Sequence, residues 1–330
     1  RELLTASVAT MKISESDRQV PTTQMGNLLA GKLAGVNVST SNGVPGVNQP
    51  GITIRTNNSW NAQPVLYVID GKIMGAGDFN NLSPNDIESI TVLKDAASAA
   101  VYGSRAAGGV ILITTKRGKS GEMQIQLSVN TGVDKRAKNV KLTNAIQQGE
   151  LFGEVFPGGF YGMEYGQEDY DYMKTINNGY GFNQLDAVWV DPSTTTYNLN
   201  ASGGNEKIKY FVGGSYVKQN GFYRSLKYDK YNIRANITAN ITKNLQVFTG
   251  MTLNRNIRNS NSWFGASQQD MYSKLLVWQP WMPAFTNGGK PFSYGWIGNF
   301  AAQANGLAGG YENLYTVKPV INLSATYKAP

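Results

Sequence analysis

The stretch YNIRANITANI, from Tyr231 to Ile241, alternates without interruption between apolar and polar side chains. Successive side chains of a β-strand point to opposite faces, so as a strand this segment has one apolar wall and one polar wall. The apolar wall carries Tyr231, Ile233, Ala235, Ile237, Ala239 and Ile241, and the polar wall carries Asn232, Arg234, Asn236, Thr238 and Asn240. Whether the apolar wall faces lipid or a protein core depends on the rest of the chain.

The same alternation recurs in five other segments after Gly121, which predicts six strands. Their apolar sets span Ile125 to Val129, Tyr197 to Ala201, Ile208 to Tyr216, Leu245 to Leu253 and Ile321 to Tyr327. Short turns at 204–206 and 242–244 alternate with longer segments at about 135–195, 218–229 and 258–316. This is the pattern of an outer-membrane barrel, whose short turns face the periplasm and whose long loops are extracellular.

An antiparallel soluble sandwich is the alternative explanation of these strands, because its strands also alternate. Two observations favour the barrel. The second face is rich in Asn, Ser, Thr and Gln, where a sandwich would leave polar groups in water, and tyrosines recur near strand ends on the apolar face. Such tyrosines are typical of the two membrane interfaces.

Residues 1–118 mix helical and strand signals and predict a small α+β domain. Met25, Leu28, Leu29 and Leu33 have helical spacing and precede Gly35, which predicts a short amphipathic helix. Asp70 and Gly71 predict a hairpin turn, and Ser83 followed by Pro84 predicts a helix start. Strands are expected at 36–39, 52–55, 65–70, 89–94 and 109–116, and a helix at 96–102 that ends at Gly103.

The composition excludes several function classes. The 330 residues include no cysteine and no histidine, which removes the usual transition-metal ligands and the commonest general base. No carboxylate pair stands out, so no enzyme activity, cofactor or metal is expected. The net charge of +8 is spread along the chain, which argues against a nucleic-acid partner. No apolar run approaches the roughly 20 residues of a membrane-spanning helix.

Several longer strings resemble a known family. PVLYVIDGKI at Pro64 to Ile73 and LSPNDIESITVLKDAASAAVYGSRAAGGVILITTKRGK at Leu82 to Lys119 closely resemble the plug domain of SusC/RagA-like TonB-dependent outer-membrane transporters. The resemblance extends upstream through QMGNLLAGKLAGVNVSTSNGVPG at Gln24 to Gly46. It resumes in ASGGNEKIKYFVGGSYVKQNG at Ala201 to Gly221 and YDKYNIRANITANITKNLQV at Tyr228 to Val247, which resemble early barrel strands of that family. Thr56 departs from the family, which usually has Gly directly after the preceding Arg.

The resemblance implies an α+β plug domain over residues 1–118, followed at 119–330 by antiparallel transmembrane β-barrel strands. Six strands cannot close around a plug, and plugged barrels have about 22 strands, so the chain is expected to be a fragment of a longer protein. The implied function is TonB-dependent import of an oligosaccharide or peptide across the Gram-negative outer membrane. The implied partners are a SusD-like surface lipoprotein and TonB, which is expected to grip a segment before Arg1.

Ligand-binding residues are expected in two places. The first is the apex of the plug, where an indole beside amides could stack a sugar ring: Arg55, Asn57, Asn58 and Trp60. The second is the long loops, where Trp263, Phe264, Trp278 and Trp281 contact ligand or, alternatively, pack within the loop. The acidic residues Glu164, Glu168, Asp169 and Asp171 are a candidate calcium site or a solvated loop.

Two other functions remain open at this point. One is a siderophore or cobalamin transporter of the same architecture, and the other is a surface glycan-binding β protein that transports nothing. The assignment of faces also predicts that Ile237→Arg destabilises the barrel, whereas Asn236→Arg, on the inner face, is mild.

Overall fold

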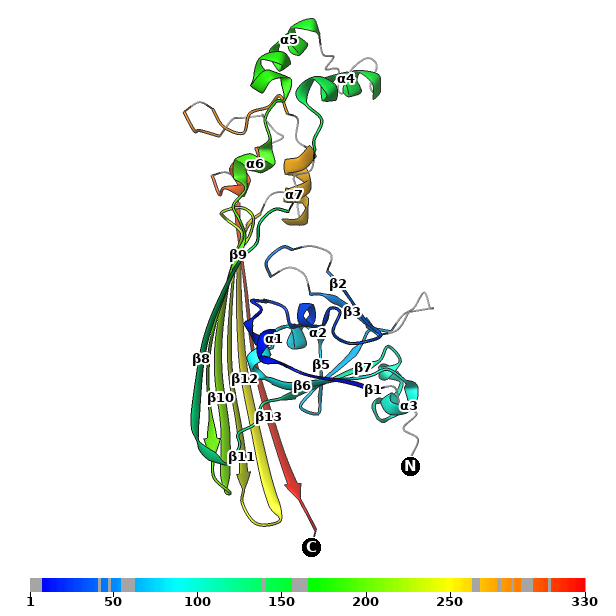
Figure 1. The fold of residues 1–330 in the computed structure, drawn as a ribbon, viewed down its shortest axis with the longest axis vertical. Coiled ribbons are helices and arrows are strands. Elements are labelled where there is room, and N and C mark those ends of the chain that lie inside the picture. The colour runs from blue at the N-terminus through cyan, green and yellow to red at the C-terminus, as the bar shows by residue number, and fades with distance from the viewer. Residues whose placement is uncertain are drawn as a thin grey trace.

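The computed structural model describes residues 8–40, 43–46, 49–54, 63–137, 141–155, 166–262, 268–277, 280–286, 288–291, 299–307 and 310–329. Figure 1 shows an N-terminal unit that lies beside one face of a long sheet, with the helices of the long loops gathered beyond one end of that sheet. The strands form a five-stranded sheet, a six-stranded sheet and a separate two-stranded pair.

The N-terminal unit is built on the five-stranded sheet, whose spatial order is β1-β6-β7-β4-β5. Its strands are β1 (Val8–Lys12), β4 (Leu66–Ile69), β5 (Lys72–Met74), β6 (Ile87–Leu93) and β7 (Val110–Thr115), and the separate pair is β2 (Val36–Ser39) with β3 (Gly51–Ile54). Asp70 and Gly71 join β4 to β5 with φ of 48° and 83°. A two-residue hairpin of this type needs positive φ at both positions, so the predicted turn is confirmed.

Short helices cover this sheet. They are α1 (Glu15–Gln19), η1 (Met25–Leu29), α2 (Ala76–Asn80), η2 (Pro84–Asp86), α3 (Ala96–Ala99) and η3 (Ala100–Ala106). The helix predicted to run through Leu33 was too long: the segment is the 3₁₀ helix η1, and Gly31 adopts a φ of 72° that a helix cannot contain. The predicted start at Ser83 is confirmed, because its side chain accepts a hydrogen bond from the Asn85 amide and Pro84 follows it.

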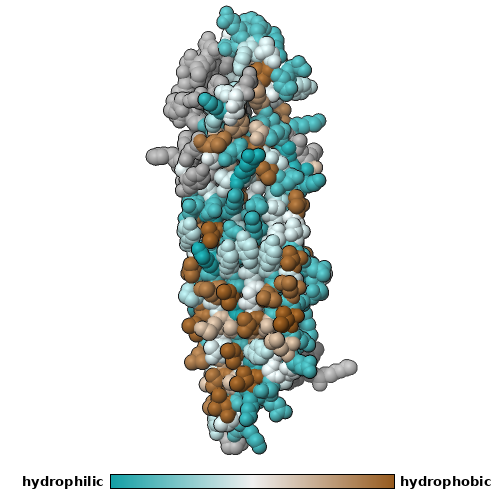
Figure 2. Space-filling view, turned by 90° about the vertical axis from the view of Figure 1, so that its left-hand side faces the viewer, coloured by the Kyte–Doolittle hydropathy of each residue, from teal (hydrophilic) through white to brown (hydrophobic). Residues whose placement is uncertain are grey.

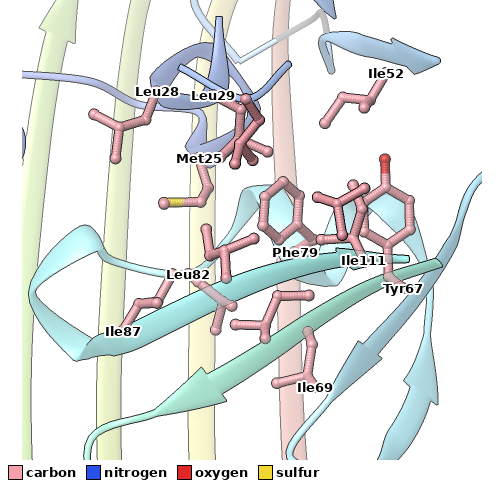
Figure 3. Packing of buried hydrophobic residues seen from close by; sticks show 14 of the residues in the cluster. Met25, Leu28, Leu29, Ile52, Tyr67, Ile69, Phe79, Leu82, Ile87 and Ile111 are labelled. Atoms are coloured by element: carbon pink, nitrogen blue, oxygen red, sulfur yellow. The ribbon is translucent and has the colours of Figure 1, made fainter. Parts of the chain in front are cut away.

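The unit has a hydrophobic core of its own (Figure 3). Phe79 stacks on Tyr67 with ring centroids 5.1 Å apart, and Leu29, Ile87 and Ile111 are fully buried beside them. Each such side chain contributes roughly 1.5–3 kcal/mol on burial. All buried members of this cluster lie between residues 13 and 113, so the core closes without help from the long sheet.

The six-stranded sheet follows sequence order, and each strand pairs antiparallel with the next. Its strands are β8 (Gly121–Val133), β9 (Ser193–Gly204), β10 (Ile208–Asn220), β11 (Lys227–Asn240), β12 (Leu245–Ser262) and β13 (Gly310–Tyr327). The six predicted strands are therefore confirmed. The loops predicted at 218–229 and 258–316 are shorter than expected, at 221–226 and 263–309, because polar residues occupy both faces near the strand ends and hide the alternation there.

The long loops contain helices that the sequence reasoning did not predict. The connection from β8 to β9 holds α4 (Ala145–Val155), α5 (Gln167–Thr175), η4 (Ile176–Gly179) and α6 (Gln184–Val188), and the connection from β12 to β13 holds α7 (Gln268–Val277) and α8 (Phe300–Ala304). Leu185, Leu275 and Phe300 pack together with Tyr223 from the 221–226 loop. None of the helices in the described ranges is both long enough and apolar enough to span a membrane.

The outer face of the long sheet carries an apolar belt. Ile233 and Ile237 are 55% and 42% exposed, whereas Asn236 between them is 1% exposed, which confirms the assignment of faces. Figure 2 shows the apolar side chains of this face gathered over its lower half, below a hydrophilic region. Tyr197, Tyr216 and Tyr231 stack across three strands, with centroids 5.8 and 4.7 Å apart.

The height of this belt matches a membrane. Tyr231 and Ile241 are ten positions apart, a distance of about 33 Å along a strand and about 25 Å for a strand tilted as in barrels. The Tyr216 hydroxyl donates to the carboxylate of Asp229 at 2.6 Å, which places a charge directly beside the tyrosine row. The outward face thus changes from apolar to polar at the position expected of a membrane interface.

An ion pair inside the N-terminal unit predicts how this unit responds to acid. Asp17 caps α1 together with Ser14 and accepts a hydrogen bond from the Lys32 ammonium, and that bond is the main cause that lowers the pKa of Asp17 to about 2. A lowered pKa stabilises the fold above the unfolded value near 4, and this contribution is lost as the pH falls through about 2. Lys32 is 36% exposed, so solvent limits the effect to about 1 kcal/mol. Lys32→Met should therefore flatten the acid limb of the unfolding free energy, measured in denaturant between pH 5 and pH 2. An unchanged acid limb would contradict this assignment.

Candidate functional site between the two units

The polar wall of the long sheet is covered by the N-terminal unit. We call the buried inward residues of β9, β10 and β11 that face this unit the docking face: Asn198, Asn200, Ser215, Lys230, Asn232, Arg234 and Asn236. Each is 9% exposed or less. Buried polar groups are costly unless they are paired, so their partners decide what this interface can do.

Arg234 lies between two carboxylates of the N-terminal unit. Its Nη1 is 3.8 Å from Asp70 Oδ2 and its Nε is 3.7 Å from Asp86 Oδ2, and all three side chains are at least nine-tenths buried. Burial raises the pKa of Asp86, although Arg234, Lys116 and Lys230 attract its charge and oppose the shift. Arg234 of the docking face therefore pairs with two buried anions from the other unit.

A hydrogen-bond chain extends from this ion pair. Asp70 accepts from the amide and hydroxyl of Thr115 at 3.0 and 2.7 Å. Asn236 donates to the same hydroxyl at 3.1 Å and to the Lys116 carbonyl at 2.7 Å. Because Asn236 is 1% exposed and bonded to the N-terminal unit, Asn236→Arg is now expected to cost more stability than the mild effect predicted from the inner face alone.

Lys230 forms hydrogen bonds to the N-terminal unit at the end of α2. Its ammonium donates to the carbonyls of Thr23 and Asn80 at 2.8 and 2.9 Å, and the side chain is 2% exposed. Asn256 donates to Asn81 at 3.1 Å in the same region. These bonds run from side chains of the sheet to a turn of the N-terminal unit, so they fix its orientation without joining the two cores.

A glycine makes close approach of the two units possible. Gly213 faces inward on β10, and a Cβ atom added there would lie 2.8 Å from Asp86 Oδ1 and 2.8 Å from Asn200 Oδ1. Contacts this short do not occur with a real Cβ, so a larger residue would displace Asp86 from the wall. The buried carboxylate thus depends on the absence of a side chain opposite it.

Space remains around the ion pair. A cavity of about 30 Å³ is lined by residues of both units, among them Asp70, Arg234, Asn236 and Asn254, and it is large enough to hold water. Arg234 Nε, Asn236 Oδ1 and Asn254 Oδ1 make no hydrogen bond to the described residues. A contact surface made of charges, amides and room for water can exchange partners more easily than a packed apolar core.

Most of the predicted ligand-binding residues lie outside the described residues. These are Arg55, Asn57, Asn58, Trp60, Trp263, Phe264 and Trp278. Trp281 is described: it is 8% exposed, lies edge-on to Phe152 with centroids 6.4 Å apart, and belongs to a cluster with Met173 and Ile176. Its position fits the alternative of packing within the loop.

Two acidic residues of the first long loop form hydrogen bonds within helix α5 and at its start. Asp169 accepts from the Gly166 amide at 2.8 Å at the start of the helix, and Asp171 is held by Gln167 at 3.1 Å and Lys174 at 2.9 Å. Glu164 lies outside the described residues. Over the described ranges, no three side chains of His, Cys, Asp or Glu gather in a way that could hold a metal ion.

The sequence predicts the polar face of the long sheet but not the carboxylates of the N-terminal unit that pair with it. Arg234 is the one charged residue of the polar wall between Tyr231 and Ile241, and a lone charge among amides is a signal for a buried counter-ion. The sequence marks Asp70 only as a turn residue, and it gives Asp86 no role beyond its place just after the helix start at Ser83 and Pro84. Their role depends on long-range docking, which local patterns do not contain.

Comparison with known proteins identifies the N-terminal unit. The family model of the TonB-dependent Receptor Plug Domain matches residues 2–110. TonB-dependent receptor SusC from Bacteroides thetaiotaomicron is 27% identical over 297 residues, which cover 86% of this chain and 27% of SusC. A TonB-dependent receptor from Formosa agariphila is 32% identical over 225 residues, 68% of this chain and 21% of that receptor.

A solved structure shows the same fold. The RagAB peptide transporter superposes with a TM-score of 0.71 at 22% sequence identity, over 88% of this chain and 36% of that chain. The two units and their arrangement therefore match a plug and part of a TonB-dependent receptor barrel. The chain spans about a quarter of the length of the curated relatives it matches.

Proposed function

Because this chain belongs to the SusC/RagA-like TonB-dependent receptors, we propose that its protein imports a nutrient across the outer membrane of a Gram-negative bacterium. The six-stranded sheet is then part of the barrel wall, and the N-terminal unit is the plug. The observation that carries the proposal is the pair of faces on the sheet: an apolar belt outside, and buried charged contacts to the plug inside.

The polar contacts between the plug and the barrel wall suit a transporter whose plug must move to open a path for cargo. The plug has its own core, so it can move against the wall while it stays folded. The contacts that must break are ion pairs and hydrogen bonds, and water can replace each of them. Energy for this step would come from TonB, which pulls on the plug from the periplasmic side.

The cargo and the surface partner are proposed from the relatives. The structural neighbour is described as a peptide transporter, and SusC is described as a TonB-dependent receptor. We take an oligosaccharide or a peptide as the cargo and a SusD-like lipoprotein as the partner, seated over the loop helices. Arg55, Asn57, Asn58 and Trp60, with Trp263, Phe264 and Trp278, remain the proposed ligand contacts, whereas the buried Trp281 is assigned to packing within the loop. The relatives are receptors, and the proposal contains no catalytic step.

Uptake in cells with and without TonB tests this function. The host strain is grown on oligosaccharides, on peptides or with a ferric chelate as the limiting nutrient, with the intact gene present or deleted. We expect the gene to support growth on a glycan or peptide, and we expect deletion of TonB to abolish that growth. Growth that survives the loss of TonB would favour a surface glycan-binding protein, and a requirement confined to the ferric chelate would favour a siderophore transporter.

A further inference from the structure

A large cavity lies between the plug and the inner face of β8, β9 and β10. Its volume is about 530 Å³, within the range of sites that bind small molecules. The plug side is formed by β1, α1 and the segment that follows β7, and the wall side includes Gln126, Asn200 and Phe211. The segment 116–120, which links the plug to β8, contributes Lys116, Arg117 and Lys119, so the cavity lies toward the end of the sheet with short turns.

The lining carries excess positive charge. Five cations line the cavity, Lys12, Arg18, Lys116, Arg117 and Lys119, against the carboxylates of Glu88 and Glu122. Only Arg18 among these seven groups forms an ion pair within the described ranges, with Glu15 at 3.3 Å. Burial is the main cause that lowers the pKa of Lys116 and Arg18 adds to it, whereas the carboxylates of Asp86, Glu15 and Glu88 oppose the shift.

This charge distribution differs from the rest of the plug interface. Elsewhere on the interface the buried Arg234 pairs with Asp70 and Asp86, the half-exposed Lys318 pairs with Asp78 at 2.5 Å, and the buried Lys230 donates to two carbonyls. Two polar atoms on the cavity wall also lack protein partners among the described residues, Arg18 Nε and Asn200 Oδ1, and Asn200 is 6% exposed. The cavity thus combines four cations that form no ion pair within the described ranges with two unpaired hydrogen-bonding atoms, around a space of ligand size.

We propose that this cavity binds the anionic groups of cargo, carboxylate or sulfate, as cargo passes the plug, and that the transporter is therefore adapted to acidic cargo. The inference rests on the proposed import function and adds the charge class of the cargo. A cleft with an excess of one sign of charge raises the local concentration of the opposite ion, by about tenfold where the excess is large. Unpaired ammonium groups can also move between successive anionic groups of a cargo chain, because their donors rotate freely.

Equilibrium binding to the purified full-length protein tests the inference without TonB. The probes are a uronate hexasaccharide, a neutral glucose hexasaccharide, hexaglutamate and hexaglutamine, each titrated at low and at physiological salt. We expect one acidic probe to bind about tenfold tighter than its neutral counterpart, with an advantage that shrinks as salt is added. Whether the uronate or the glutamate probe shows the advantage identifies the backbone of the cargo.

Variants then locate the site. The triple variant Lys12→Gln, Lys116→Gln and Lys119→Gln removes three cavity charges and should abolish the preference for the acidic probe. The matched control replaces three exposed lysines outside the cavity, Lys207, Lys227 and Lys243, and should keep it. The inference is overturned if no probe binds, if acidic and neutral probes bind equally, or if the cavity variant keeps its preference. Since the assay needs no transport, these outcomes are distinct from a failure of TonB-dependent uptake.

Discussion

Replacing Arg234 with methionine is expected to destabilise the seated plug by about 3–5 kcal/mol, because it leaves two buried carboxylates without their cation. Asp70 and Asp86 approach this one guanidinium from different segments of the plug, and both are almost fully buried. Methionine has a similar length and keeps most of the packing, so the lost charge dominates. The effect is measured in the full-length protein as the urea dependence of protease cleavage within the plug.

The matched control is the triple variant Arg234→Met, Asp70→Asn and Asp86→Asn, which removes the anions together with the cation. Replacing all members of a buried ion cluster by neutral groups costs far less than removing one, so protease resistance should largely return. A single Arg234→Met variant as resistant as the parent would show that the ion pairs do not seat the plug.

Low pH should also reduce the destabilisation that the single Arg234→Met substitution causes. Burial already raises the pKa of Asp86 in the parent, so the ionised carboxyl opposes folding, and this cost appears as the pH rises through the folded-state pKa. Without Arg234 the largest of the attractions that offset burial is lost, although Lys116 and Lys230 remain, so the carboxyl is protonated at a higher pH still. The gap between variant and parent should therefore be widest near pH 8 and narrow toward pH 5.

The strands of the long sheet could be predicted because one physical constraint acts on every residue of the belt. Lipid outside and polar contacts inside force a period of two, and Tyr231 to Ile241 shows it without exception. The helices of the long loops escaped prediction because no such constraint applies there. α5 and α6 are short, and much of their stability comes from packing against other loop segments, as Met173 and Leu185 show.

The interior of the interface was harder to predict than its walls. Asn232 and Asn236 were correctly placed on the polar face, but a period of two cannot tell a water-filled lumen from a docked plug. The partner of Asn236 is Thr115, more than a hundred residues earlier in the chain. The hairpin turn alone is enough to explain Asp70 in the sequence. Its second role, the ion pair with Arg234, therefore could not be predicted from the local pattern.

The outer belt gives the second large expected effect. Ile237 lies near the middle of the belt on β11 and is 42% exposed on the outward face, so Ile237→Arg should destabilise the barrel by about 2–4 kcal/mol. The cost arises because a guanidinium at mid-depth must either lose its hydration or draw water and headgroups into the hydrocarbon. The measurement is the free energy of unfolding of the full-length protein in lipid vesicles, followed in denaturant.

A second variant at a different depth in the membrane shows whether lipid exposure, and not a general intolerance of arginine, causes the destabilisation. Ile241 lies at the edge of the belt beside a short turn and is 61% exposed, so Ile241→Arg should cost only about 0–1 kcal/mol in the same vesicles. If this same fold were soluble, these partly exposed positions would face water, and both substitutions would be mild. A large difference between the two variants in lipid, which disappears in thinner or more hydrated micelles, therefore requires a membrane around Ile237. Equal and small effects in lipid would remove the basis for treating this face as membrane-exposed.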